Sequence, residues 1–312
     1  MHIAQIGTGR VGRPTAYSIM EAKLPDTLTL CDTRPGVAAA FAEELKHVKV
    51  STQNNVEICS CEKDEQVTNA DIILISAGEP RLPGVKMSRR DLAVQNAKII
   101  KDVSEATRAG NPNAKYIVIT NPVDSMAMVC KKYTKAQYVI STGTNLESMR
   151  FRSFLCEKFH LPPSKVEGWV GGEHGDAAVP LWSTTKVNGV SIEEYSALAG
   201  VPLERRQVES YVKEVSKFIV DNMGGTEYGP AASFRDITRA IVRNTNETLS
   251  IAAPKIFPQI SEPIFVGIPT RIGQTLGSSL YQSLTETEKS RLEEASRAIF
   301  QTYLSAIEGI EK

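Results

Sequence analysis

Three glycines near the start of the chain have the spacing of a phosphate-binding turn. Gly7, Gly9 and Gly12 form a GxGxxG pattern in GTGRVG, directly after an apolar run and directly before a helix-like segment. Gly7 permits a tight turn, Gly9 lets the backbone approach a pyrophosphate, and Gly12 lets the helix pack on a sheet. The start of that helix also presents free N–H groups and a positive dipole end to phosphates. We therefore predict a dinucleotide cofactor bound by Gly7, Thr8, Gly9, Arg10, Val11 and Gly12.

An acidic residue at the expected distance strengthens this interpretation. Asp32 follows the glycines by roughly 20 residues, at the end of a second predicted strand. There a carboxylate can accept hydrogen bonds from the adenosine ribose and repel a 2′-phosphate, which favours NAD over NADP. Arg34 is a nearby cation that would soften this preference. A glycine turn with a surface aspartate is the competing interpretation. It is disfavoured because the strand, the glycines, the helix and the aspartate all occur in the expected order and at the expected spacing.

A helix-like segment that begins at Asn145 carries an acid and a base on one face. Glu147 and Arg150 are three residues apart, so they share a face of the predicted helix. Such spacing usually marks a solvated ion pair, and this pair taken alone would be interpreted in that way. Further on, His174 lies in GGEHGDAAVP at 171–180. The glycines there predict a turn in which the backbone bends sharply or approaches another group closely.

Two further segments follow predicted strands. The segment 80–92, PRLPGVKMSRRDL, combines prolines, a glycine and basic residues, which predict a mobile, cationic loop. Asn121 lies in TNPVD at 120–124, where another predicted strand ends. Open α/β sheets bind ligands at the carboxyl ends of their strands, so we expect both segments at the ligand-binding edge. An exposed charged loop is the competing interpretation of 80–92.

Short β-branched runs alternate with helix-like stretches through the first half of the chain. Such alternation predicts a parallel sheet with helices on both faces. We predict an α/β fold, with a Rossmann-type doubly wound parallel sheet over residues 1–144 and a second, α+β domain over 145–312. The predicted strands are 2–6, 27–31, 72–76, 116–120 and 139–142. The predicted helices include 37–47, 91–109 and 285–310, the last covering the second domain.

Composition argues against several classes of protein. The 312 residues include 36 basic and 36 acidic side chains, so the net charge is zero and a nucleic-acid binder is not expected. No run of about 18 apolar residues occurs, so we expect no membrane span. The N-terminal segment lacks the features of a secretion signal, and the five cysteines lack zinc-site spacing. We therefore expect a cytoplasmic protein with buried free thiols and no metal site.

Six motifs resemble those of the lactate/malate dehydrogenase family in their order and spacing. They are GTGRVG, Asp32, SRRDL, TNPVD, TNLESMRFR and GGEHGD, and the resemblance runs from Ile3 to beyond Gly229. It implies an NAD-dependent 2-hydroxyacid dehydrogenase whose second domain binds a small-molecule substrate and carries the catalytic residues. It also implies a homo-oligomer, and the residues of the later motifs are similar to those of tetrameric members.

The resemblance assigns a role to each polar residue. It implies that His174 is the proton donor and acceptor, which suits a side chain that titrates near neutrality. Glu147 stands where the family usually has aspartate and would orient the ring. Arg150 would hold the substrate C1 carboxylate in a bidentate contact. Arg89 would polarise the carbonyl, and Asn121 would contact the substrate oxygen. Further cofactor contacts are implied for Asn96, Ile119, Thr120 and Asn121.

The substrate depends largely on one early position of segment 80–92. In the family, arginine there accompanies malate-type activity and glutamine accompanies lactate-type activity, because the second carboxylate of oxaloacetate needs a cation once water is excluded. Arg81 and Pro230 both resemble malate-type members, which implies interconversion of (S)-malate and oxaloacetate, a step of the tricarboxylic acid cycle. The stretch from Arg81 to Arg89 is longer than the usual pattern. An L-lactate or broader 2-hydroxyacid dehydrogenase, and an inactive NAD-binding sensor, therefore stay open as alternatives.

Overall fold

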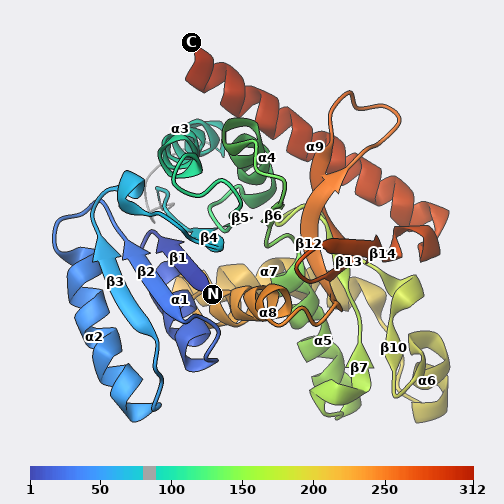
Figure 1. Ribbon diagram of the computed structural model, residues 1–312. Helices are drawn as coiled ribbons and strands as arrows, with labels where there is room; N and C mark the ends of the chain where they lie inside the picture. Colours follow the sequence, from blue (N-terminus) through green and yellow to red (C-terminus); the bar gives the residue numbers. More distant parts are fainter. Residues whose placement is uncertain (80–88) are drawn as a thin grey trace.

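Six parallel strands form the half of the sheet that carries the glycine-rich turn. The computed structural model describes residues 1–79 and 89–312. The strand order is β3-β2-β1-β4-β5-β6, and every neighbouring pair is parallel (Figure 1). The order reverses between β1 and β4, which is the switch point where such sheets bind ligands. The predicted doubly wound sheet is therefore confirmed. Its strands are β1 (His2–Ile6), β2 (Thr27–Cys31), β3 (Glu57–Cys61), β4 (Ile72–Ile75), β5 (Lys115–Val118) and β6 (Val139–Ser141).

One strand of this half was not predicted. The five predicted strands are present, with small shifts at their ends, and β3 is the addition. It lies at the edge of the sheet, and each of its residues is at least partly exposed. Since an edge strand need not bury both faces, its sequence EICSC lacks the continuous apolar run that marks β4.

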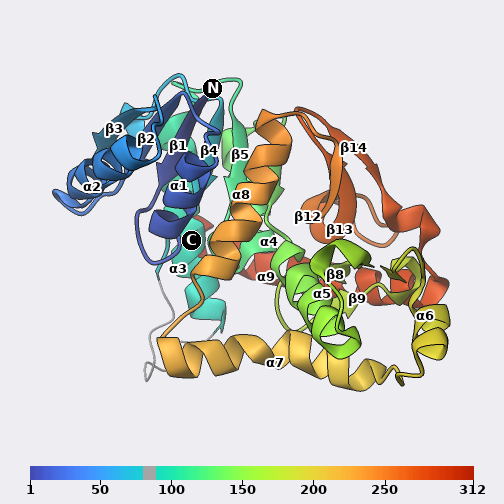
Figure 2. The same ribbon diagram turned by 90° about the horizontal axis from the view of Figure 1, so that it is seen from below.

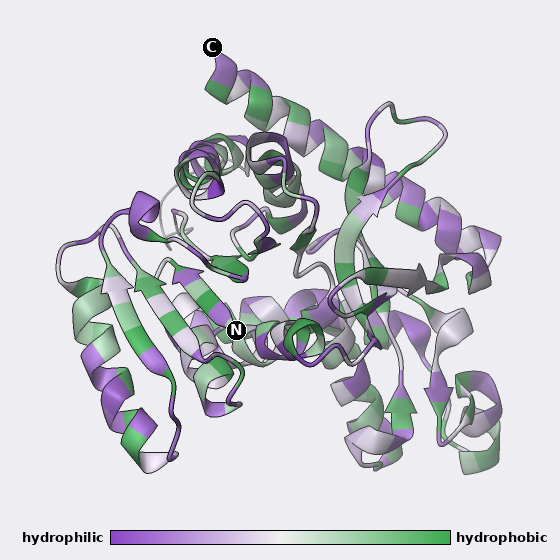
Figure 3. Ribbon diagram, in the orientation of Figure 1, coloured by the Kyte–Doolittle hydropathy of each residue, from purple (hydrophilic) through white to green (hydrophobic). Residues whose placement is uncertain are grey.

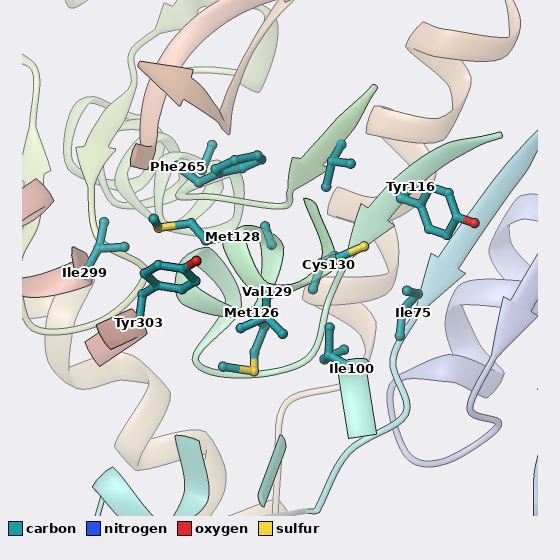
Figure 4. Packing of buried hydrophobic residues seen from close by; sticks show 14 of the residues in the cluster. Ile75, Ile100, Tyr116, Met126, Met128, Val129, Cys130, Phe265, Ile299 and Tyr303 are labelled. Atoms are coloured by element: carbon teal, nitrogen blue, oxygen red, sulfur yellow. The ribbon is translucent and has the colours of Figure 1, made fainter. Parts of the chain in front are cut away.

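Helices cover both faces of the parallel sheet. In β4, Ile72 and Leu74 face one side and Ile73 and Ile75 face the other, and all four are buried. The first pair packs with α1, α2 and α8, and the second with α3, α4 and α9, part of which Figure 4 shows. These helices are α1 (Gly12–Glu21), α2 (Val37–Ser51), α3 (Arg89–Arg108), α4 (Val123–Thr134), α8 (Tyr228–Val242) and α9 (Glu286–Glu311).

The sheet continues into the second half of the chain. β6 pairs antiparallel with β12 at Ser141 and Ala252, and the sheet runs on through β13 to β8 and β9. A Cβ on Gly143 would lie 2.5 Å from the nitrogen of Ala252, so this close approach requires glycine. The residues of β13 are mostly apolar, whereas β12 has charged residues at both ends and a mixed colouring in Figure 3. The strands are β8 (Val170–Gly172), β9 (Ala178–Pro180), β12 (Glu247–Lys255), β13 (Ile264–Ile272) and β14 (Leu276–Ser279).

The remaining elements surround this antiparallel part. Helix α5 (Asn145–Phe159) packs against α7 (Arg205–Met223) and α8, and Figure 2 shows α7 running beneath both. A small sheet of β7 (Val166–Glu167), β10 (Lys186–Val187) and β11 (Val190–Ser191) lies beside α6 (Ile192–Ala199). Short 3-10 helices are η1 (Asp64–Gln66), η2 (Pro163–Lys165), η3 (Trp182–Thr184) and η4 (Leu280–Ser283).

The last helix contacts both halves of the chain, whereas the sequence predicts contact with the second domain. A helix was expected at 285–310 over the second domain, and α9 does pack on β13 and β8. It also packs on α3 and α4 of the first half, where the Ser125 hydroxyl donates to the carbonyl of Ile299 at 3.1 Å. The prediction of its partner was therefore wrong in part, because helical periodicity defines an apolar face and not the surface which that face meets.

Two expectations from composition can be compared with the structure. Among the described helices, none is long and apolar enough to cross a membrane. All five cysteines are free, and Cys31 and Cys130 are buried. Cys59, Cys61 and Cys156 are partly exposed, so the prediction that all five thiols are buried was wrong for these three. Two of them lie on the edge strand β3, which explains their exposure.

Candidate active site

The glycine-rich turn has the geometry that its spacing predicts. Gly7 has φ +86° and donates its N–H to the carbonyl of Cys31 at 2.8 Å. A Cβ there would lie 2.5 Å from the nitrogen of Ala77, and a Cβ on Gly12 would lie 2.0 Å from the carbonyl oxygen of Gly7. A Cβ on Gly9, by contrast, would meet nothing within 4 Å. Gly7 and Gly12 therefore permit close packing, whereas Gly9 leaves open space through which a phosphate can approach the backbone.

Asp32 lies next to this turn and is already hydrogen-bonded. One carboxylate oxygen accepts from the N–H and the hydroxyl of Thr8, at 2.9 and 2.8 Å. Arg34 makes a bidentate contact, with Nε and Nη2 each 2.8 Å from a carboxylate oxygen. Burial acts to raise the pKa of Asp32, but the hydrogen bonds from Arg34 and Thr8 outweigh it and hold that pKa well below its ordinary value. The aspartate is therefore charged at neutral pH, beside a cation that offsets part of its charge.

A second group of predicted residues lies after β5 and on the facing helix α3. Asn96 is buried, its side-chain oxygen accepts from the N–H of Glu79 at 2.7 Å, and its amide donates to the carbonyl of Asn121 at 2.7 Å. The Thr120 hydroxyl donates to the carbonyl of Ala77 at 2.7 Å. Ile119 is buried in the core below them. These contacts hold the two strand ends together at the switch point, beside the glycine-rich turn.

The three polar residues of the second half come together. Nδ1 of His174 lies 3.0 Å from Oε1 of Glu147, and Arg150 Nη1 lies 3.6 Å from the same oxygen. Within the described residues, His174 Nδ1 has no aligned hydrogen bond, so the contact with Glu147 is an ion pair without ideal direction. Glu147 is buried, which excludes the solvated ion pair that its spacing alone would indicate.

The charges of this cluster change the protonation of its members. The negative charge of Glu147 raises the pKa of His174 to about 9, against burial, which lowers it. Burial acts to raise the pKa of Glu147, but the charges of His174 and Arg150 outweigh it, and the result lies below the ordinary value. The imidazole is therefore protonated and the carboxylate is ionised near neutrality.

The glycines around His174 shape its loop. Gly172 has φ +91° and Gly175 has φ +132°, a range that side chains with a Cβ rarely adopt. A Cβ on Gly172 would also lie 2.4 Å from the carbonyl oxygen of Ala177. The loop thus reverses direction tightly between β8 and β9 and directs His174 toward α5, as the glycine pattern predicts.

Sequence reasoning missed one residue of this site. Asp124, in the first turn of α4, accepts the backbone N–H of His174 at 3.0 Å and the hydroxyl of Ser141 at 2.6 Å. It is buried, and burial raises its pKa to about 6 despite those hydrogen bonds. The available signal was a carboxylate inside the mostly apolar run VDSMAMVC, because a buried acid requires specific partners.

Some predicted residues cannot be placed. Arg81 and the side chain of Arg89 lie outside the described residues, although α3 begins at Arg89. Pro230 is buried in the first turn of α8. Over residues 1–79 and 89–312, no group of three or more histidine, cysteine, aspartate or glutamate side chains could hold a metal ion.

Comparison with known proteins agrees with this arrangement. The family profile described as lactate/malate dehydrogenase, NAD binding domain, matches residues 1–139, and that for the alpha/beta C-terminal domain matches residues 144–306. A malate dehydrogenase of Sulfolobus acidocaldarius is 37% identical over 310 residues, which are 99% of this chain and 98% of the relative. One from Sulfurisphaera tokodaii is 38% identical over 309 residues, or 99% and 97%.

Lactate dehydrogenases are also similar. An L-lactate dehydrogenase of Bacillus caldolyticus is 30% identical over 294 residues, covering 93% of this chain and 92% of the relative. The crystal structure of a minor L-lactate dehydrogenase from Enterococcus mundtii, in a ligands-bound form, has a TM-score of 0.90 at 27% identity and covers 97% and 98% of the two chains. The chain belongs to the lactate/malate dehydrogenase family.

Proposed function

We propose that this chain is a malate dehydrogenase that transfers hydride reversibly between (S)-malate and oxaloacetate with NAD. The observation that carries the chemistry is the contact between His174 and the buried Glu147, with the His174 N–H bonded to Asp124 shortly after β5. The substrate assignment is supported by Arg81 in the sequence and by the two malate dehydrogenases that match over nearly the full length. This reaction places the enzyme in the tricarboxylic acid cycle.

The residues around the glycine-rich turn fit NAD. The open side of Gly9 leaves room for the pyrophosphate. The carboxylate of Asp32 would lie beside the adenosine ribose and accept hydrogen bonds from its hydroxyls. Thr8, Arg10 and Val11 complete the turn. Helix α3 supplies Asn96, and the segment after β5 supplies Ile119, Thr120 and Asn121. When bound, NAD supplies the nicotinamide ring that takes the hydride from C2 of malate and returns it to oxaloacetate.

In this proposal His174 exchanges the proton. Because Nδ1 faces Glu147, Nε2 is the ring nitrogen that can take the hydroxyl proton of malate or return it to the oxygen of oxaloacetate. Glu147 keeps the ring oriented and stabilises the imidazolium that malate oxidation produces. The raised pKa of His174 means that the free enzyme already carries the proton that oxaloacetate reduction consumes.

Arginines recognise the carboxylates of the substrate in this scheme. Arg150 would bind the C1 carboxylate, since its 3.6 Å contact with Glu147 is long enough to leave its donors available. Arg81 would bind the second carboxylate, and Arg89 would polarise the carbonyl. Asn121 would donate to the substrate oxygen. In this proposal, residues 1–144 form the NAD-binding domain and residues 145–312 form the catalytic domain.

One comparison of rates tests the proposed substrate. NADH oxidation is measured with oxaloacetate and with pyruvate in parallel, and again with NADPH in place of NADH. Fast turnover with oxaloacetate alone supports the malate assignment. A preference for pyruvate would instead identify a lactate-type enzyme, and turnover with neither substrate despite NADH binding would favour an NAD-binding sensor.

We also propose that the enzyme is a homo-oligomer, and specifically a tetramer, located in the cytoplasm. Phe218, Val220, Met223 and Tyr228 are large apolar side chains exposed within residues 218–228, which is typical of a surface that contacts a second copy. The five free cysteines suit a reducing compartment. Light scattering of the purified protein would give its mass, and a monomeric mass would refute the proposed assembly.

A further inference from the structure

Two cysteines lie next to each other at the ends of neighbouring strands. Cys31 is the last residue of β2 and Cys61 is the last residue of β3, and the register of this parallel pair places them opposite each other (Figure 1). We propose that Cys31 and Cys61 form a redox-active dithiol, which a hydroperoxide oxidises to a disulfide that weakens cofactor binding. The thiol chemistry is independent of the proposed function, whereas its effect rests on the proposed role of Asp32 in holding the cofactor.

The two side chains lie on the same face of the sheet. Cys31 belongs to the apolar cluster that packs with α3, and Cys61 packs against the same cluster. Neighbouring strands are about 4.8 Å apart, and a disulfide joins residues whose Cα atoms are about 4.4 to 6.8 Å apart. The register therefore brings the two cysteines within the separation that a disulfide requires.

The surroundings of the pair make Cys61 the sulfur that reacts first. Cys31 is fully buried, and its thiol donates to Oδ1 of Asp64 at 3.3 Å. A hydrogen bond with Cys61, together with burial, raises the pKa of Cys31, whereas the same hydrogen bond lowers the pKa of Cys61. Cys61 is also partly exposed on the edge strand. Because the thiolate is the nucleophilic form, Cys61 is the one that a peroxide from solvent reaches and oxidises.

The oxidation has two steps. The Cys61 thiolate attacks a peroxide oxygen, so an S–O bond forms, the O–O bond breaks, and the released alkoxide or hydroxide takes up a proton. The Cys31 sulfur then attacks the Cys61 sulfur, so the S–S bond forms and hydroxide leaves with the proton that Cys31 shares with Asp64. The two thiols lose two electrons and two protons, and the hydroperoxide that accepts them becomes an alcohol and water, or two waters for hydrogen peroxide.

The backbone of both cysteines is bonded to the proposed cofactor site. The carbonyl of Cys31 accepts the N–H of Gly7 at 2.8 Å, and the carbonyl of Cys61 accepts the N–H of Asp32 at 3.2 Å. A disulfide needs Cβ atoms about 3.5 to 4.5 Å apart, which is less than the spacing of neighbouring strands, so the strand ends must move together. In the described sheet β3 pairs only with β2, so its end can shift. The shift displaces the peptide of Asp32, whose carboxylate we expect beside the ribose.

A count of free thiols tests the disulfide directly. The full chain is treated with hydrogen peroxide, its free thiols are alkylated after unfolding, and the mass of the chain gives their number. Of the five cysteines, we expect all but two to be alkylated after oxidation, and all five after reduction with dithiothreitol. In Cys61→Ser every remaining thiol should stay free. Cys59→Ser is the matched control, because Cys59 lies on the same strand opposite Thr29, and this variant should still lose two free thiols.

The effect on the cofactor is measured on the same samples. Displacing a charged group from its hydrogen bonds should raise the Kd of NADH, followed by fluorescence, by at least about tenfold. At saturating NADH, kcat should change less than about twofold, because the proton-transfer group lies in the other half of the chain. Dithiothreitol should restore the Kd, and peroxide should leave the Kd of Cys61→Ser unchanged.

Three results would overturn the inference. All five thiols staying free after peroxide, or the loss of two free thiols in Cys61→Ser, would refute the pairing of Cys31 with Cys61. A disulfide between them that leaves the Kd of NADH unchanged would refute its control of the cofactor site. None of these measurements depends on the substrate, so a reduced enzyme that fails to turn over oxaloacetate would refute the proposed function and leave the test of the dithiol intact.

Discussion

Replacing Glu147 by glutamine tests whether its charge controls the protonation of His174. The pKa of His174 is raised from 6.5 to about 9, chiefly by Glu147, while burial and the charge of Arg150 act to lower it. Glutamine keeps the size of the side chain and removes the charge. Because burial and Arg150 still lower it in the variant, we expect the pKa of His174 to fall at least close to 6.5, a fall of about 2.5 pH units or more, equivalent to about 3 kcal/mol or more.

The effect on the rate follows from the fraction of enzyme that carries the proton. At about pH 8 a group with a pKa of about 9 is about 90% protonated, and one with a pKa of about 6.5 is about 3% protonated. Reduction of oxaloacetate consumes this proton, so kcat/KM at that pH should fall about 30-fold in Glu147→Gln. The loss should shrink as the pH is lowered from about 8 toward 6, because the variant then carries the proton in a larger fraction of its molecules.

The assay is the pH profile of kcat/KM for oxaloacetate reduction, followed by the loss of NADH absorbance from about pH 5.5 to 10. Glu157→Gln is the matched control, because Glu157 is exposed on the same helix, and its profile should coincide with that of the unchanged enzyme. If the descending limb of Glu147→Gln stays near pH 9 while NADH still binds, then Glu147 does not set the pKa of His174 and the electrostatic argument fails.

Three further substitutions test separate parts of the site. His174→Asn removes the proton donor, so turnover should fall by about 10²- to 10⁴-fold while NADH affinity, measured by fluorescence, is kept; near-normal turnover would refute the acid–base role. Arg81→Gln should lower kcat/KM for oxaloacetate far more than for pyruvate, because only oxaloacetate has a second carboxylate, and equal losses would contradict that role. Arg34→Ala leaves the charge of Asp32 unbalanced, so the preference for NADH over NADPH should rise about tenfold; an unchanged ratio of kcat/KM for the two cofactors would show that Arg34 does not moderate it.

Much of the parallel sheet could be predicted because strands buried on both faces consist of continuous apolar residues. β4 is buried on both faces, so its run of apolar residues is continuous, and the glycine-rich turn has a fixed spacing. The edge strand β3 has no such run and was missed. The partners of α9 could not be predicted, since a pattern of apolar residues does not identify the surface that covers it.

The sequence predicted most residues of the candidate site but missed Asp124. Family resemblance grouped Glu147, Arg150 and His174, and the structure places Arg150 and His174 each within ion-pair distance of Glu147. Asp124 was missed because an acid in the first turn of a helix is common at exposed helix starts, where it interacts with the helix dipole. Its burial depends on the packing of α4 against β6, which sequence spacing does not reveal.

Helix α9 has a consequence for how the molecule unfolds. Its 26 residues contact α3 and α4 on one side of the junction and β13, β8 and β9 on the other, and Ser125 and Ser183 bond to it from the two halves. The two family profiles divide the chain near residue 140, as if it consisted of two separable modules. Because the two halves share one sheet and one helix, unfolding of either half exposes apolar surface of the other to water. We therefore expect a single cooperative transition in calorimetry, and fragments cut at the junction should be unable to fold alone.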